Sequence, residues 1–145
     1  MGTNCRPVFY NLKRISSVYS KLKFRTDKLK LSDVVYKIPC SCGLSYVGQT
    51  KQWLEKRVYQ HKYDCKVTNY LNKDHTALAK HHFETSHRFL FEDVEILDTE
   101  PVQRKRNVSE MVQIYLNNTV NLKTDTNNLS NMYNNLLELF KNKNR

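Results

Sequence analysis

The stretch that decides the fold is VVYKIPCSCGLSYVGQT, residues 34–50 of a 145-residue chain. It predicts a β-hairpin with its tip at residues 40–43. Because side chains alternate along a strand, we expect Tyr36 on the same face as Tyr46 and Gly48 of the second strand. Both phenols then point the same way, which indicates a reactive face.

The hairpin tip carries two thiols, Cys40 and Cys42, that share one side and could bind one metal ion. Zinc takes thiolate and imidazole ligands, and two more are needed. Four histidines follow within thirteen residues: His75, His81, His82 and His87. His81 and His87 converge only if their helix ends near residues 85–86. The predicted structural zinc site is Cys40, Cys42, His81 and His87. His82 and His75 stay open as substitutes for His81, and a turn with buried thiols and surface histidines is the alternative.

The net charge of +10 and the sequence pI of about 9.5 favour a polyanionic partner. Residues 1–32 hold eight Lys or Arg against one acid, whereas residues 33–99 balance at nine against nine. Apolar residues interleave with the bases of residues 1–32 at helical spacing, which predicts a basic helical arm. A solvated tail and a membrane-surface helix are the alternatives, but a large apolar face is missing, so nucleic acid is favoured.

Four cysteines, at positions 5, 40, 42 and 65, are too few and too irregular for a secreted disulfide scaffold. Neither a signal peptide nor a membrane-spanning segment is visible. We therefore expect a reducing intracellular compartment and no membrane partner. There, a close pair of thiols more often binds metal than forms a disulfide.

The pattern of elements predicts an α+β fold, a small antiparallel three-stranded sheet flanked by helices. The expected order is a basic arm over 1–32, hairpin strands over 33–49, helices over 51–66 and from Thr76, a strand over 89–97, a helix after Pro101, an Asn-rich loop over 117–128 and a helix over 129–140. The expected domains are the arm, 1–32, and one domain, 33–145.

Apolar spacing predicts which side of each helix is buried. The expected inward residues are Leu54, Val58 and Cys65 in the first helix, Val108, Met111, Val112, Tyr115 and Leu116 after Pro101, and Leu129, Met132, Tyr133, Leu136, Leu137 and Phe140 in the last helix.

Three further residues could act on a phosphate. Arg57 and His61 are four apart on the first helix and project side by side. A guanidinium can bind two phosphate oxygens, and an imidazole can transfer a proton near neutral pH. Glu110 is the one carboxylate in residues 105–124, and a hard cation such as Mg²⁺ prefers oxygen ligands. An ordinary exposed helix face is the alternative for each.

The chain resembles the GIY-YIG nuclease superfamily in the order and spacing of Tyr36, Tyr46-Val47-Gly48, Arg57, His61, Glu110 and Asn121. More narrowly, the cysteines between the tyrosine motifs, TALAKHHFETSH at 76–87 and NLKTD at 121–125 resemble the endonuclease domain of Penelope-like retroelements. The resemblance covers about residues 33 to 140. It departs from the family in lacking a glycine before Tyr36 and in having one extra residue between Tyr46 and Arg57.

The resemblance implies roles for these residues. Tyr36 and Tyr46 would reach the scissile phosphate, Arg57 would stabilise its charge and His61 would assist proton transfer. Glu110 would hold Mg²⁺ or Mn²⁺, and Asn121 would orient the site. Because a phenol has an ordinary pKa near 10, Tyr36 can act as a base only if that pKa is lowered; hydrogen-bond positioning is its other role.

The resemblance also implies a nuclear protein that nicks target DNA and leaves a 3′ hydroxyl for target-primed reverse transcription. The implied partners are DNA, a reverse transcriptase domain and the element RNA. Two other functions stay open, a non-catalytic zinc module that binds nucleic acid and a protein-interaction domain that uses the Asn-rich end. Magnesium-dependent nicking distinguishes the first function from the others.

Overall fold

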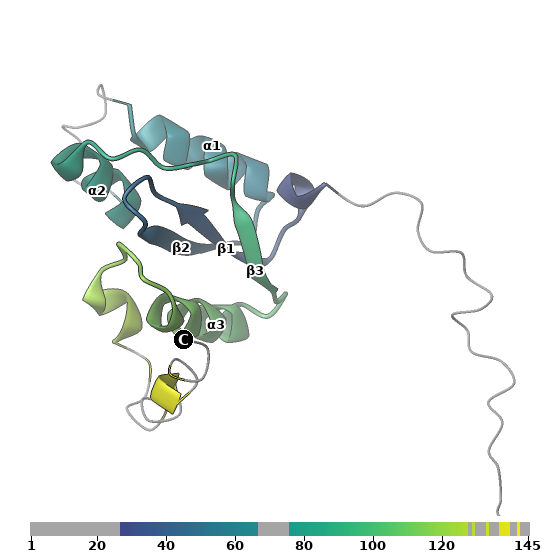
Figure 1. The fold of residues 1–145 in the computed structure, drawn as a ribbon. Coiled ribbons are helices and arrows are strands. Elements are labelled where there is room, and N and C mark those ends of the chain that lie inside the picture. The colour runs from purple at the N-terminus through teal and green to yellow at the C-terminus, as the bar shows by residue number, and fades with distance from the viewer. Residues whose placement is uncertain are drawn as a thin grey trace, which may run out of the picture.

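The computed structural model describes residues 27–66, 76–127, 129, 133, 137–139 and 142 and has the expected α+β fold. Its three antiparallel strands are arranged in the order β2-β1-β3, with α1 on one side of the sheet and α3 on the other (Figure 1). The elements are η2 (Lys28–Lys30), β1 (Val34–Pro39), β2 (Ser45–Thr50), α1 (Leu54–Asp64), α2 (Ala77–Thr85), β3 (Glu95–Thr99), α3 (Gln103–Leu116) and η4 (Lys123–Thr126).

The hairpin of β1 and β2 forms as predicted. Gly43 takes a φ of +87° at its tip, a left-handed conformation that suits glycine. The N–H of Cys40 donates to the carbonyl of Leu44 over 2.8 Å and closes the turn. In this register Tyr36 lies opposite Gly48, so the predicted shared face of the two tyrosines is confirmed.

The two faces of the sheet are buried by different helices. On one face, Val34, Tyr36 and Ile38 of β1 form a core with Leu54 and Val58 of α1. On the other face, Val35 and Val47 pack against Ile114 of α3. The alternation along β1 therefore places every second side chain under α1 and the others under α3.

The first helix begins at Leu54 rather than at residue 51. The hydroxyl of Thr50 accepts from the N–H of Gln52 over 3.1 Å and lies 3.3 Å from its carbonyl. Such local side-chain bonds compete with helical ones. Leu54 and Val58 are buried as predicted, and His61 joins them with no exposed surface.

The third strand is Glu95–Thr99, so the predicted range of residues 89–97 is wrong at both ends. Phe89 forms only an isolated bridge to Cys40, and the N–H of Asp93 donates to the carbonyl of Leu90, which makes a turn before β3. Apolar residues on both sides of this turn produced a continuous pattern in the sequence.

The predicted buried stripe of α3 is wrong. Val108 is exposed, and the other four residues of the stripe are only partly buried. The buried positions are Arg106 and Ile114, two helical turns apart on the opposite side. The reason is that the sheet presents the polar side chain of Gln49 to α3, and Arg106 bonds to it.

Several predictions lie wholly or partly outside the described residues, including most of the basic arm and of the helix over 129–140. Leu137 is buried and Tyr133 is exposed. Leu29 and Leu31, assigned to the arm, pack against the core, so the folded part includes them. Among the described residues, none of the helices is long and apolar enough to cross a membrane.

Candidate active site and metal centre

Tyr36 lies at the centre of a polar group on the α1 side of the sheet. Its hydroxyl is 2.8 Å from Nε2 of His61 and accepts a 3.3 Å hydrogen bond from Nε of Arg57. The ring of Tyr46 meets the imidazole of His61 edge-on, with the ring centroids 5.1 Å apart. Four of the predicted site residues, from three elements, are therefore in contact.

Gly48 makes this close approach feasible. A Cβ atom at Gly48 would lie 2.7 Å from the hydroxyl oxygen of Tyr36 and 2.9 Å from Cε1 of Tyr46. Both distances are shorter than non-bonded carbon contacts allow. The glycine is therefore required here for space, whereas Gly43 is required for backbone conformation.

Burial sets the protonation of the polar group. It raises the pKa of Tyr36 well above the usual 10.0, with a smaller contribution from Tyr46, and the charge of Arg57 only partly opposes this. Burial, with the charge of Arg57, lowers the pKa of His61 from 6.5 to about 3. At neutral pH the site therefore holds a neutral phenol and a neutral imidazole, not the ordinary titrating histidine expected from the sequence.

The contacts of His61 indicate which ring nitrogen carries its proton. Nδ1 is buried and has no hydrogen-bond partner. A buried N–H without a partner is rarer than a buried acceptor without one. We therefore assign the proton to Nε2, which donates to the hydroxyl oxygen of Tyr36. That oxygen then accepts from both His61 and Arg57, and its own proton takes part in neither bond, although Tyr36 has no exposed surface.

Glu110 lies on the α3 side of the sheet, where a buried network holds it. Its Oε2 accepts a 2.7 Å hydrogen bond from Nε2 of Gln49, whose Oε1 accepts a 2.9 Å bond from Nε of Arg106. Arg106 is fully buried and forms a 3.0 Å ion pair with Asp33. Because a guanidinium can only donate, Arg106 fixes the orientation of the Gln49 amide and so aims its NH₂ at Glu110.

The two sides of the site interact electrostatically across β2. Burial raises the pKa of Glu110, while the hydrogen bond from Gln49 and the charge of Arg57 lower it in part. In turn, the charge of Glu110 contributes to the raised pKa of Tyr46 and, less, of Tyr36. The carboxylate is therefore within electrostatic range of the phenols and the guanidinium.

Asn121 lies at the outer edge of β2 and contacts backbone. Its Oδ1 accepts from the N–H of Val47 over 2.9 Å, and its Nδ2 donates to the carbonyl of Val47 over 2.8 Å. One amide side chain thus makes both hydrogen bonds that a neighbouring strand would make. It holds the backbone between Tyr46 and Gly48, the two residues that pack around Tyr36.

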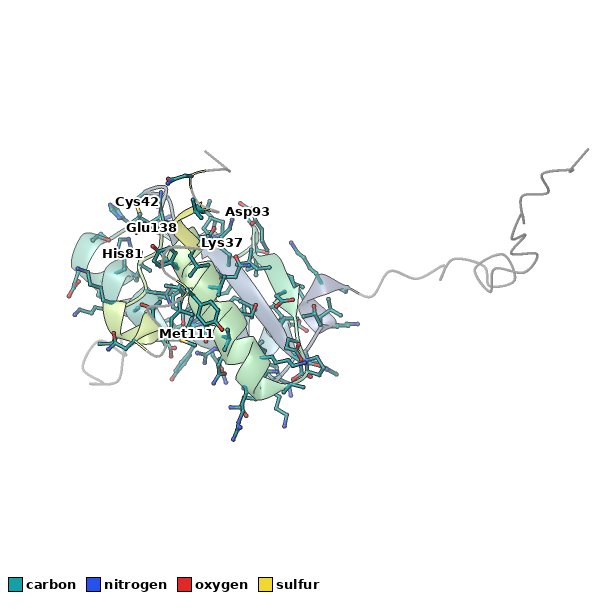
Figure 2. The ribbon with its side chains drawn as sticks, turned by 90° about the horizontal axis from the view of Figure 1, so that it is seen from below. Lys37, Cys42, His81, Asp93, Met111 and Glu138 are labelled. Carbon is teal, nitrogen blue, oxygen red and sulfur yellow. The ribbon has the colours of Figure 1, made fainter. Side chains whose placement is uncertain are left out.

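The second centre is the cluster of Cys40, Cys42, His81 and His87, whose ligand atoms all lie within 4.8 Å of one another. The Nε2 atom of His81 is 3.6 Å from Sγ of Cys40, 3.5 Å from Sγ of Cys42 and 3.2 Å from Nδ1 of His87. Figure 2 shows Cys42 and His81 at one end of the molecule.

The three distances from Nε2 of His81 fit the edges of a zinc tetrahedron. With Zn–S of about 2.3 Å and Zn–N of about 2.05 Å, the S···N and N···N edges of a tetrahedron are about 3.6 Å and about 3.3 Å. Burial, with the neighbouring Cys42 thiol, raises the pKa of Cys40; a divalent cation favours the thiolate and opposes this effect. The cluster can therefore bind a metal ion such as zinc.

The convergence of the two histidines depends on where α2 ends. Thr76 caps its start by accepting from the N–H of Ala79. The helix ends at Thr85, and Ser86 takes a left-handed φ of 58°, which turns the chain so that His87 returns to His81. The helix therefore ends where it must for His81 and His87 to converge, near residues 85–86.

His82 has a different role from His81. Its Nδ1–H donates to the carbonyl of His87 over 2.7 Å, which fixes the turn after α2. The described cluster therefore contains His81, and His82 supports it from outside. His75, the other open substitute, lies outside the described residues.

Gln49, Arg106 and Asp33 were missed in the sequence. Gln49 reads as an ordinary strand residue and Arg106 as an exposed base of a helix. The spacing of Arg106 and Glu110, four apart and thus on one helix face, is a signal that could have grouped them. Nothing in the sequence links either residue to Gln49.

The chain matches no protein-family model, no curated protein and no solved structure. The chemistry of the site therefore rests on its geometry. Two phenols and a guanidinium meet on the α1 side of the edge strand β2, and a carboxylate lies on its α3 side. A guanidinium can bind phosphate oxygens, and a carboxylate can bind a hard cation.

Proposed function

We propose that the protein is a divalent-metal-dependent DNA endonuclease of the GIY-YIG type, from a Penelope-like retroelement. The observation that carries this proposal is the meeting of Tyr36, Tyr46 and Arg57 around Gly48, with Glu110 within electrostatic range. The net charge of +10 supports a polyanionic substrate.

In this proposal the side chains divide the work of phosphodiester hydrolysis. Arg57 neutralises the charge that develops on the phosphate oxygens. Tyr36, a neutral phenol held by His61 and Arg57, donates its proton in a hydrogen bond to the phosphate. Positioning is therefore the role of Tyr36 rather than general base, because its pKa is raised.

Glu110 is the residue proposed to hold Mg²⁺ or Mn²⁺. A bound divalent cation would supply Lewis-acid stabilisation and lower the pKa of a coordinated water. The hydrogen bond from Gln49 occupies Oε2 and fixes the orientation of the carboxylate. Asn121 has a supporting role, because it fixes the strand that carries Tyr46.

The proposed wider role is that of the family it resembles. The nick leaves a 3′ hydroxyl in nuclear DNA, from which a reverse transcriptase domain copies the element RNA. The excess of Lys and Arg in residues 1–32 supports binding to DNA.

Nicking of supercoiled plasmid with Mg²⁺ or Mn²⁺ tests the proposal. We expect the chain to convert plasmid to the open circle. Glu110→Gln and Arg57→Ala should abolish conversion while DNA binding survives and the circular dichroism spectrum stays unchanged. Nicking that persists in Glu110→Gln would contradict the assigned metal ligand.

The second candidate is a non-catalytic zinc module that binds nucleic acid. The four-ligand cluster favours it, because such a site leaves no open position for chemistry. It predicts tight, salt-dependent DNA binding without nicking by any variant.

A further inference from the structure

Helix α1 exposes large aromatic side chains to solvent on different sides. Trp53, at its N-cap, is 53% exposed, Tyr59 is 67% exposed and Tyr63 is 49% exposed. Large exposed rings are unfavourable in water and are concentrated at binding surfaces. The charged side chains around each ring indicate whether it belongs to a binding surface or is a single exposed residue.

Helical geometry assigns the rings to separate sides. At 100° per residue, the buried side of α1 is centred on Leu54, Val58 and His61. Trp53 lies on one flank, near Arg57, and Tyr59 lies on the other; Tyr63, four residues after Tyr59, lies between them and nearer to Tyr59. We call the residues Trp53, Lys56 and Gln60, with Tyr63 at their far edge, the Trp53 flank.

The Trp53 flank is continuous with the candidate active site. Nη1 of Arg57 donates to Oε1 of Gln60 over 3.2 Å, while Nε of the same guanidinium donates to Tyr36. A nucleic acid strand bound at Arg57 would therefore pass over Gln60 and the neighbouring rings.

Each ring of the flank has a lysine above it. Nζ of Lys56 lies 5.6 Å from the ring centroid of Trp53, and Nζ of Lys66 lies 5.4 Å from that of Tyr63. By the same rotation Asp64, in the last turn of the helix, is the one acid of α1 that lies on this side. Aromatic rings beside ammonium groups suit nucleic acid, because bases stack on the rings and phosphates pair with the cations.

The opposite flank has different chemistry. Tyr59 lines a cavity of about 200 Å³ together with Glu55, Glu92 and Lys62. The one lysine there forms a 2.7 Å ion pair with Glu92. Two carboxylates and a paired lysine would repel a phosphate backbone, so of these two flanks the Trp53 flank is the one complementary to DNA.

We propose that the Trp53 flank is a DNA-binding surface that holds unpaired bases beside the candidate active site. Trp53 and Tyr63 stack on the bases, and Lys56 and Lys66 contact the adjoining phosphates. This inference rests on the proposed function for its substrate and adds a preference for DNA with a single-stranded segment at the site of cleavage.

The test uses the fact that Trp53 is the one tryptophan of the chain, so tryptophan fluorescence reports on this surface alone. Fluorescence is titrated with two DNAs of equal length, one a blunt duplex and one a duplex with a single-stranded overhang, without added Mg²⁺ or Mn²⁺. We expect quenching by the overhang DNA and a weaker effect of the blunt duplex.

Single substitutions measure how much Trp53 and Lys56 contribute to the free energy of DNA binding. Trp53→Ala should raise the Kd for overhang DNA about 5- to 150-fold, the range expected for losing one stacked base. Lys56→Ala should reduce the slope of log affinity against log salt by about 0.7. Tyr59→Ala is the matched control, an exposed aromatic of the same helix, and should leave the Kd unchanged.

Two results would overturn the inference. One is a Trp53→Ala variant that binds overhang DNA as tightly as the wild type. The other is an equal loss of affinity for the blunt duplex, which would place Trp53 against the backbone rather than against bases. Either result, with plasmid nicking intact, leaves the proposed function standing; a chain that binds and nicks no DNA fails both proposals.

Discussion

At the scale of single residues, the site depends on how close two rings approach one strand. Tyr36 and Tyr46 both pack over Gly48, and any Cβ there would overlap them. The same packing removes water from Tyr36 and His61 and thereby sets their protonation. The close packing of the two rings and the protonation of Tyr36 and His61 therefore both depend on the contact over Gly48.

Replacement of Gly48 tests this contact. Gly48→Ala should destabilise the fold by about 1–3 kcal/mol, the usual cost of overpacking, and should displace the Tyr36 hydroxyl from Arg57. The clash is sharpest with that hydroxyl, so the same substitution in a Tyr36→Phe background should cost less. Urea unfolding of the four proteins measures the difference. Equal costs in the two backgrounds would show that the hydroxyl does not occupy this space.

The buried imidazole of His61 makes stability depend on pH. Its pKa is about 3 in the folded chain and 6.5 when unperturbed, so between these values the unfolded state binds more protons. The contribution of neutral His61 to the free energy of unfolding is therefore present above pH 6.5 and is lost as the pH falls toward 3.

The comparison that isolates this effect is with His61→Gln, whose amide cannot titrate. Urea unfolding between pH 7 and pH 4 should show a steeper acid loss of stability in the wild type than in the variant. Glu110, with its raised pKa, acts in the opposite direction but equally in both proteins. Parallel pH profiles would mean that His61 is protonated in the folded chain.

At the scale of elements, the proposed zinc site joins the hairpin tip to α2. Residues 39–41 of the tip already pair with the chain after α2, since the N–H of Ser41 donates to the carbonyl of Arg88 and that of Leu90 to the carbonyl of Pro39. These bonds bring His87 beside the thiols. A metal ion would therefore strengthen a contact between the hairpin tip and the chain after α2 that backbone hydrogen bonds already make.

Removal of the metal should lower stability without changing the chemistry of molecules that stay folded. With metal at about 100 times its Kd, binding contributes about 2.7 kcal/mol. A chelator should thus lower the melting temperature of the wild type and leave Cys42→Ser, already missing a ligand, unaffected. Circular dichroism melts measure both. Loss of nicking in Cys42→Ser at saturating Mg²⁺, with unchanged melting, would instead assign the cluster a direct part in catalysis.

The elements also show what the sequence could predict. The hairpin and the members of the ligand cluster followed from side-chain alternation and ligand chemistry, whereas the end of α2 before Ser86 was only the condition under which His81 and His87 could converge. The buried face of α3 did not follow from the sequence, because its apolar stripe competed with a polar contact between Arg106 and Gln49, residues 57 positions apart. The hydrophobic periodicity of a helix sequence identifies its apolar face but does not identify polar side chains that are buried in pairs.

At the scale of the whole molecule, the boundary between arm and fold lies earlier than the charge pattern suggests. Residues 1–26 hold six Lys or Arg and no acid. Residues 27–32 belong to the fold, because Leu29 and Leu31 pack on its core and the carbonyl of Leu31 accepts from the N–H of Leu54.

Two truncations separate charge from packing. Removing residues 1–26 should leave the melting temperature unchanged and make DNA binding less dependent on salt, with the slope falling by about 0.7–0.9 for each lost phosphate contact. Removing residues 1–32 should also lower the melting temperature, because it takes Leu29 and Leu31 from the core. Thermal melts and salt titrations of both chains measure these effects. If removal of residues 1–26 leaves the salt slope unchanged, the electrostatic contact with DNA lies elsewhere, and the Trp53 flank is the first surface to test. If the two truncated chains have equal melting temperatures, residues 27–32 do not stabilise the fold.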